Sequence, residues 1–167
     1  MSDQQERLDI KSWIVGFTDG EGCFSVSFLK NRTSKSGWQI FPEFVITQGA
    51  KSISALEIFH TFFKCGKIYK NKRYDNHKEH LYRYCVRSIK DLEQRIIPFF
   101  KKYPLKTLKQ QDFLLFSKII KIMSVRKHLT KVGAKKIALL IGRMNRKKKS
   151  RYLKSSETRR HAPVYAG

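Results

Sequence analysis

Paired cysteines and long apolar runs are both missing from the sequence. The three cysteines, Cys23, Cys65 and Cys85, are odd in number and form no CxxC spacing, which argues against a disulfide framework or a zinc finger and favours free thiols in a reducing compartment. The longest apolar run, FLLFSKIIKIM, is interrupted by Lys118 and Lys121 and is too short to cross a bilayer. The polar start, MSDQQERLDI, does not suit a secretory signal. We therefore expect an intracellular protein with no membrane partner.

Acidic residues are scarce as well. The 167 residues contain 13 Asp and Glu against 36 Lys and Arg, so the formal net charge is +23 at pH 7. This balance predicts attraction to a polyanion through phosphate contacts and counterion release, and nucleic acid is the partner that fits best. Hydrophobic residues still make up 41% and aromatic residues 13% of the chain. The protein is therefore no disordered basic tail, and it is long enough to form one domain with a core.

The spacing of apolar residues changes several times along the chain and predicts alternating helices and strands. Asp9 can serve as the N-cap of a first helix, Gly66 can end a second, and Pro42 suggests a bulge or an edge in a strand. The sequence thus predicts an α+β fold with an antiparallel sheet, in the order helix, two strands, helix, two strands and further helices. The expected helices cover residues 9–20, 52–63, 90–98, 108–123 and 137–144, and the expected strands cover residues 24–29, 39–48, 67–74 and 80–88.

The C-terminal part of the chain is strongly basic, with Glu157 as the only acid in residues 118–160. We expect a folded domain over residues 1–149 and a basic tail over residues 150–167. Two roles for the basic run stay open, namely a solvated tail that aids solubility and a segment that binds phosphates.

One acidic point interrupts the basic chain, in the segment WIVGFTDGEGCFSVSF at residues 13–28. Asp19 and Glu21 stand at the expected end of a helix, where the macrodipole favours cations instead. An ordinary helix terminus with Gly20 and Gly22 as its C-cap is one explanation. The other is chemical, because a carboxylate near phosphates is repelled unless a divalent cation lies between them. Mg²⁺ held at such a point would serve phosphodiester hydrolysis.

The segment IVGFTDGEG, residues 14–22, resembles the LAGLIDADG motif of homing endonucleases. Later segments are similar to the same family: VITQ ending at Gln48, PLKTLKQQDF at residues 104–113, and HLTKVGAKKI with GRMN at residues 128–145. The resemblance implies an αββαββα fold whose antiparallel sheet forms a saddle on double-stranded DNA, followed by C-terminal helices. It also implies a Mg²⁺-dependent nuclease that makes staggered double-strand breaks in a long, pseudo-palindromic target and so supports intron homing.

A single copy of the motif is present, which implies the homodimeric branch of this family. Gly16 and Gly20 are four residues apart on the expected helix, where they would leave room for the backbone of a second copy. The residues expected at the dimer interface are Trp13, Gly16, Phe17, Asp19 and Gly20.

The resemblance also implies roles for single residues. Glu21 matches the last acid of the motif, the metal ligand, with the carbonyl of Gly20 beside it, and Asp19 matches an acid whose role is partly structural. Gln48 matches a polar residue that organises water near the metal, and Lys109 is the best match to the active-site lysine. For base recognition we expect the outward residues of the strands and turns: Ser25, Ser27, Asn31, Gln39, Tyr69, Asn71, Arg83 and Arg87.

Two other functions stay open. Some proteins of this family act as maturases that help intron RNA to splice, and a non-cleaving DNA-binding regulator would bind in the same way without hydrolysis. Glu21 favours the nuclease, because a pure binder needs no carboxylate there. His77 and His80, in HKEH, lack the further ligands that a zinc site requires. The resemblance suggests an intron-encoded protein of an organelle (chloroplast or mitochondrion) or of a microbe.

Overall fold

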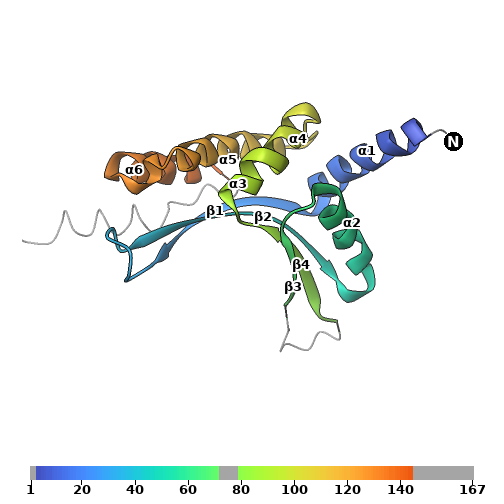
Figure 1. Ribbon diagram of the computed structural model, residues 1–167, viewed down its shortest axis with the longest axis horizontal. Helices are drawn as coiled ribbons and strands as arrows, with labels where there is room; N and C mark the ends of the chain where they lie inside the picture. The colour runs from blue at the N-terminus through green and yellow to red at the C-terminus, as the bar shows by residue number, and fades with distance from the viewer. Residues whose placement is uncertain (1–2, 72–78, 145–167) are drawn as a thin grey trace, which may run out of the picture.

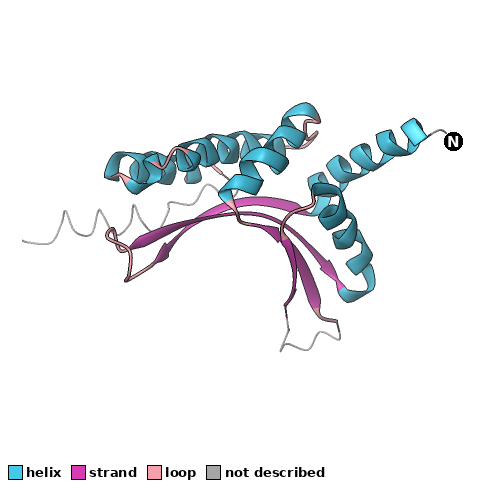
Figure 2. Cartoon of the chain, viewed as in Figure 1, coloured by secondary structure: helices cyan, strands magenta, loops and turns pink. Residues whose placement is uncertain are grey.

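A four-stranded antiparallel sheet and a layer of helices make up the fold of the computed structural model, which describes residues 3–71 and 79–144 (Figure 1). The sheet is arched, and Figure 2 shows the described helices on its convex side, with the concave side left uncovered by them. The strands are β1 (Gly22–Lys30), β2 (Trp38–Gly49), β3 (Lys67–Asn71) and β4 (Leu81–Val86). The helices are α1 (Asp3–Glu21), α2 (Ile53–Phe63), α3 (Ile89–Asp91), α4 (Ile97–Lys102), α5 (Lys109–Ser124) and α6 (Lys131–Ile141), with short turns η1 (Ala50–Ser52), η2 (Leu92–Ile96) and η3 (Lys127–Leu129). The α+β fold with an antiparallel sheet is confirmed.

The strands lie in the order β1-β2-β4-β3. β2 pairs with β1 over residues 38–46, but it pairs with β4 only over residues 44–49. The first half of β2 is therefore a local edge, and an edge tolerates Pro42 although proline has no backbone N–H to donate. Pro42 pairs with Val26 in an unbroken register. The prediction of an edge at Pro42 is thus right, and the prediction of a bulge is wrong.

Phenylalanine rings fill the space between the sheet and the helices. Phe24 of β1 stacks on Phe44 of β2 with ring centroids 5.0 Å apart, and it meets Phe100 of α4 and Phe113 and Phe116 of α5 at 5.3–5.5 Å. All five side chains are fully buried. Truncation of a buried ring of this kind costs about 3–5 kcal/mol. This packing fixes α5 against β1, directly after the point where α1 ends.

Two helix boundaries differ in an instructive way from the sequence pattern. α1 begins at Asp3, so Asp9 lies inside the helix and the prediction of an N-cap there is wrong. α2 ends at Phe63, and the left-handed Lys64 (φ 51°) is its C-cap. Gly66 follows with φ +78°, and a Cβ there would lie 2.7 Å from the carbonyl oxygen of Cys85. Glycine is therefore required after α2 by both its conformation and its close approach to β4.

A π-helical turn explains how a proline enters the next helical run. η2 is this turn, and α4 follows with Pro98 in its first turn. Proline lacks an N–H and its ring clashes with a carbonyl of the preceding turn, so a locally wider helix relieves the conflict. The sequence predicts that the helix breaks near Pro98, but the helical path continues to Lys102.

α5 agrees with the expected helix over residues 108–123 to within one residue, but α6 covers Lys131–Ile141 and not the expected residues 137–144. The predicted boundary at residue 149, the tail over residues 150–167, His77 and residues 72–74 lie outside the described residues. None of the described helices combines the length and the apolar character that a membrane span needs. The three cysteines are free thiols, as predicted.

Candidate functional site

Asp19 joins the C-terminal end of α1 to the segment that leads into α5. Its carboxylate accepts hydrogen bonds from the backbone N–H groups of Lys106 (2.7 Å) and Thr107 (3.2 Å) and from the Thr107 hydroxyl (2.7 Å). Desolvation by itself would raise the pKa of Asp19, but these hydrogen bonds and the nearby Lys109 ammonium outweigh it, so the pKa lies below its ordinary value. Asp19 is therefore engaged within its own chain, where it fixes α5 relative to α1.

Lys109, the first residue of α5, caps α1 from outside the helix. The last four carbonyls of an α-helix have no partner within it, and the last turn of α1 contains no basic residue. The Lys109 ammonium donates to the carbonyl oxygens of Thr18 (2.8 Å) and Asp19 (2.9 Å). Burial lowers the pKa of Lys109, while nearby Cys23 and the carboxylates of Asp19 and Glu21 oppose that shift. This cation at the negative end of the α1 dipole makes two acids tolerable there.

Glu21, the last residue of α1, is exposed. In contrast to Asp19, its carboxylate accepts no hydrogen bond from any residue of ranges 3–71 and 79–144. The carbonyl of Gly20 is another terminal group of the helix. Carboxylate and carbonyl oxygens are the ligands that Mg²⁺ prefers, so this pair suits a divalent cation. The described residues contain no group of three or more His, Cys, Asp or Glu side chains that could hold a metal, so water, DNA or a second chain would have to complete its coordination.

Gln48 lies near the end of β2, where it pairs with Tyr82 of β4. The pair formed by Gly22 and Ile46 places this end of β2 beside the junction of α1 and β1. Residues two apart on a strand point to the same side of the sheet, so Gln48 lies on the same side as Ile46. Its side chain is half-buried. The fold thus brings Gln48 to the same end of the sheet as Glu21, although no hydrogen bond joins these two side chains within the described part of the chain.

The faces of α1 differ in what they contact. Trp13 and Phe17 pack on each other (4.8 Å between centroids) and against Phe59 of α2 (5.6 and 5.7 Å). Gly16 and Gly20 are exposed, and a Cβ on either would have no atom within 4 Å apart from its chain neighbours and the backbone of its own helix. Among the five residues expected at a dimer interface, the two glycines are therefore open, whereas both rings and Asp19 have partners inside the chain.

Gly22 is not the C-cap that the sequence suggests. Neither Gly20 nor Gly22 has a positive φ, so no left-handed turn ends α1. A Cβ on Gly22 would lie 2.8 Å from the Thr18 carbonyl oxygen and 3.1 Å from Cδ1 of Ile46. Glycine is needed there because β1 leaves the helix in close contact with its last turn.

The residues expected to recognise bases gather on the concave side of the sheet. Core side chains of each strand point to the convex helices, so the alternate residues point the other way. This places Ser25, Ser27, Gln39, Tyr69, Asn71 and Arg83 on the concave face, with Arg87 just after β4 and Asn31 just after β1. Asn31 also shapes its turn, because its side-chain oxygen accepts from the N–H (3.0 Å) and hydroxyl (2.7 Å) of Thr33.

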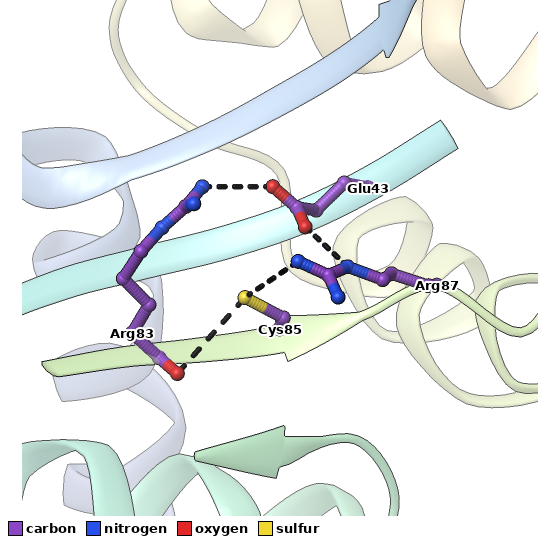
Figure 3. Close-up of polar contacts among 4 residues, drawn as sticks. All are labelled: Glu43, Arg83, Cys85 and Arg87. Atoms are coloured by element: carbon purple, nitrogen blue, oxygen red, sulfur yellow. Dashed lines mark hydrogen bonds and ion pairs between the residues drawn. The ribbon is translucent and has the colours of Figure 1, made fainter. Parts of the chain in front are cut away.

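Sequence reasoning missed Glu43, which lies at the centre of this face. Its side chain is buried (residue exposure 6%), and its two carboxylate oxygens accept from Nη2 of Arg83 (2.9 Å) and Nε of Arg87 (2.5 Å), as Figure 3 shows. The Arg87 guanidinium also lies over the rings of Phe41 (5.1 Å) and Tyr69 (5.0 Å). The sequence did contain one signal that could have identified Glu43, namely an acid at an outward position of a strand in a basic protein.

The sequence matches the LAGLIDADG endonuclease family over residues 14–120, a stretch that contains the end of α1, the whole sheet and most of α5. The chain belongs to the LAGLIDADG homing endonuclease family. The predicted fold of that family is confirmed by solved structures. The homing endonuclease I-TnaI superposes with a TM-score of 0.78 at 38% identity, over 89% of this chain and 96% of that chain. I-SmaMI bound to cleaved DNA superposes with a TM-score of 0.80 at 34% identity, over 94% of this chain and 50% of that chain.

Several curated relatives of this LAGLIDADG chain are named as intron-encoded or DNA endonucleases. Probable intron-encoded endonuclease 2 of Neurospora crassa is 37% identical over 128 residues, which are 75% of this chain and 27% of that protein. DNA endonuclease I-CeuI of Chlamydomonas moewusii is 29% identical over 99 residues, which are 59% of this chain and 44% of that protein. The chain thus spans less than half the length of these two relatives.

Proposed function

We propose that this chain is a site-specific endonuclease that hydrolyses both strands of a long, pseudo-palindromic DNA target and leaves staggered ends. Membership of an endonuclease family supports a DNA-cleaving enzyme. The observation that carries the proposal is the open carboxylate of Glu21, at the end of a helix where Asp19 and two neighbouring carbonyls are already bound. An exposed acid on a strongly basic chain can lie next to phosphates if a bound divalent cation bridges the two.

The residues at the end of α1 divide the chemistry between them. Glu21 and the carbonyl of Gly20 would hold Mg²⁺, which when bound polarises a phosphate and lowers the pKa of an attacking water. Lys109 has three N–H donors, and two of them bind the α1 carbonyls. The third can donate to a phosphate oxygen and stabilise the charge that develops there. Gln48, at the same end of the sheet, orients water, and no side chain needs to become a covalent nucleophile.

A second copy of the chain would supply the second cleavage centre. Gly16 and Gly20 leave an open strip on α1 where another helix can approach closely. Two-fold symmetry would then bring two Glu21 carboxylates to adjacent phosphates of opposite strands and would explain a pseudo-palindromic target. The match to only half of the I-SmaMI chain, against nearly all of the I-TnaI chain, supports a unit that needs one more copy of the fold. In this arrangement Asp19, Trp13 and Phe17 would hold the interface helix in place from behind.

DNA would lie along the concave face, where the predicted recognition residues converge. That face is uncovered by the described helices and carries donors such as Ser25, Gln39 and Arg83 for base edges and phosphates. A relative from Podospora anserina is named after an ND4 intron, and others are named as intron-encoded. These names support a role in intron homing and an origin in an organelle.

A cleavage assay separates this proposal from its alternatives. The protein is incubated with a DNA target library in Mg²⁺, in Ca²⁺ and in excess chelator, and bound and cut sequences are recovered. Staggered ends in Mg²⁺ alone are the expected result. Selective binding with no cutting in any condition would make the chain a DNA-binding regulator, and preference for intron RNA over all DNA would make it a maturase.

The variant Glu21→Gln tests the assignment of the site. We expect the cleavage rate on the recovered target to fall by about a thousandfold or more, because the loss of a metal ligand removes several kcal/mol of transition-state stabilisation. Affinity for the same DNA should stay within about tenfold of wild type, since one side chain is lost from a large interface. Glu93→Gln, an exposed acid in η2, is the charge-matched control. Cleavage by Glu21→Gln at the wild-type rate would contradict the assignment.

A further inference from the structure

Glu43 is the most deeply buried acid among the described residues whose exposure is resolved, and it lies on the face that is otherwise basic and uncovered. A buried carboxylate is costly unless charged partners and hydrogen bonds compensate it. Both partners come from the region of β4, on the strand next to β2. By the register of β2 with β4, Arg83 stands opposite Thr47, and its side chain extends across to β2 to reach Glu43.

The two arginines keep donors for a ligand. A guanidinium has five N–H donors, and the bond to Glu43 uses Nη2 of Arg83 and Nε of Arg87. One further contact, from Nη2 of Arg87 to the sulfur of Cys85, is long at 3.9 Å (Figure 3). The arginine side chains are 34% and 38% exposed. Their remaining N–H groups can therefore reach the solvent on the concave face.

Two aromatic rings also lie against the Arg87 guanidinium. Phe41 of β2 and Tyr69 of β3 each place a ring about 5 Å from its guanidinium carbon. With Glu43 bonded to Nε and two rings beside the guanidinium, the rotamers open to this side chain are restricted before any DNA binds. A restrained arginine gives up less conformational entropy when it forms a pair of hydrogen bonds.

We propose that Glu43 is a specificity-determining residue that positions Arg83 and Arg87 as one rigid unit for reading hydrogen-bond acceptors of guanine in the major groove. This inference rests on the proposed function, because it takes the concave face as the DNA-binding surface. Glu43 itself touches no base and acts through the two guanidinium groups. Arginine suits guanine because its paired donors match O6 and N7.

The positioning role predicts an effect that a purely structural role does not. Glu43→Gln removes one negative charge from the DNA-facing surface, so affinity for unrelated DNA should stay equal or rise. The same change releases the two arginines, so the advantage of the correct target over a scrambled duplex should fall by about tenfold or more. A variant that merely loosens the fold would weaken binding to both duplexes together.

The experiment measures binding of wild type and Glu43→Gln to a library that contains every single base-pair substitution of the recovered target. Expected is a loss of preference at the guanine positions that Arg83→Ala also loses, with other positions unchanged. Glu57→Gln, an exposed acid on α2, removes the same charge away from this face and should keep the wild-type profile. An unaltered profile for Glu43→Gln, or uniform weakening at all positions, would overturn the inference.

Two further variants keep the test decisive if Glu43→Gln does not fold. Arg87→Lys retains the positive charge but lacks the paired N–H donors of a guanidinium. It should therefore lose base preference at a subset of the positions that depend on the unit of Arg83 and Arg87. In the variant with Glu43→Gln and Arg83→Ala together, the losses should overlap and not add, because both changes disable the same unit. Fully additive losses would show that Glu43 and Arg83 act separately.

If wild type itself shows no sequence preference, the proposed function fails together with the inference. A selective wild type with an unaltered variant refutes the inference alone.

Discussion

Asp19 and Glu43 are both carboxylates held by donors of their own chain, yet they fix different things. Asp19, at the junction of α1 and α5, binds the backbone of Lys106 and Thr107 and so fixes the course of the chain. Glu43, on the concave face, binds two flexible arginine side chains and so fixes their orientation. The first arrangement positions a helix end, and the second positions donors for a ligand. In this basic protein, each of these two acids therefore lies where a part of the structure has to keep a fixed position.

Glu21 completes the comparison, because it stands two residues from Asp19 and is held by no described residue. The backbone around it is fixed by the hydrogen bonds that Asp19 and Lys109 form. An open carboxylate on a rigid support is what a metal ligand requires. Under the proposed function, Asp19 therefore has a structural role at the junction and leaves Glu21 open for the metal.

After the loss expected for Glu21→Gln, the largest expected effect is at the same junction. Lys109→Met removes the ammonium that binds the Thr18 and Asp19 carbonyls. We expect cleavage to slow by about a hundredfold or more, since a preorganised donor to developing charge is worth that much in comparable sites. Single-turnover cleavage of the recovered target measures it. Lys106→Met changes an exposed lysine three residues earlier, which contributes only its backbone N–H, and should cut near the wild-type rate. Equal rates for the two variants would remove Lys109 from the active site.

The next effect is on the concave face and concerns stability. Replacement of Arg83 and Arg87 by alanine together would leave the Glu43 carboxylate buried without a cation. Such a loss costs about 3–5 kcal/mol for a fully buried pair, and we expect about 2 kcal/mol because each arginine is more than a third exposed. Each single replacement should cost clearly less than half of that, since the other arginine remains. Urea unfolding measures the free energy.

Adding Glu43→Gln to this double variant should restore part of the lost stability, because a neutral amide is cheaper to bury than an unpaired carboxylate. No recovery would show that the arginines stabilise the sheet by packing alone. Asp91→Asn, which removes a surface ion pair with Arg95 at 3.7 Å, should change the free energy of unfolding by less than about 0.5 kcal/mol.

Apart from the Asp91→Asn control, the smallest effect comes from Asp19→Ala, for which we expect a loss of about 1 kcal/mol at neutral pH, since its hydrogen bonds are charged but exposed to solvent. The pKa of Asp19 is lowered by folding from its ordinary value of 3.8. Its contribution is therefore complete above that value and is lost as the pH falls through the lower pKa of the folded state. Unfolding of both proteins as a function of pH should show curves that converge in acid. A difference that stays constant below pH 3.8 would contradict the ionic role.

The sequence was sufficient for features with a local period. Alternation of apolar residues predicted the strands and therefore which residues share the concave face, and helical spacing predicted α2 and α5 closely. The sequence pattern failed where contacts with residues distant in the sequence determine the local structure. Asp9 is a good N-cap by composition, but α1 continues past it. Gly22 looks like a C-cap, but its close contact with Thr18 and Ile46 explains it.

The same distinction between local sequence patterns and distant contacts applies to the candidate site. The motif predicts Glu21 and Gly20 as metal ligands from adjacent positions in the sequence, and this assignment stays a prediction. The bonds of Asp19 to residues 106 and 107, and of Lys109 to the end of α1, depend on how α5 packs on β1, so no local pattern could reveal them. Glu43 was missed because its burial depends on two arginines from the region of another strand. The roles of Gln48 and Lys109 in catalysis stay predictions.

The short overlap between β2 and β4 has a consequence for how such a protein changes its target. Only residues 44–49 of β2 pair with β4, so the outer part of the β1–β2 hairpin has no pairing with β3 or β4. Side chains there, such as Ser27 and Gln39, can be exchanged without disturbing strand pairing near Glu43. Under the proposed function, selection could therefore alter the DNA contacts of the outer hairpin while those around Glu43 are preserved, which would give a homing endonuclease a stepwise route to new target sites.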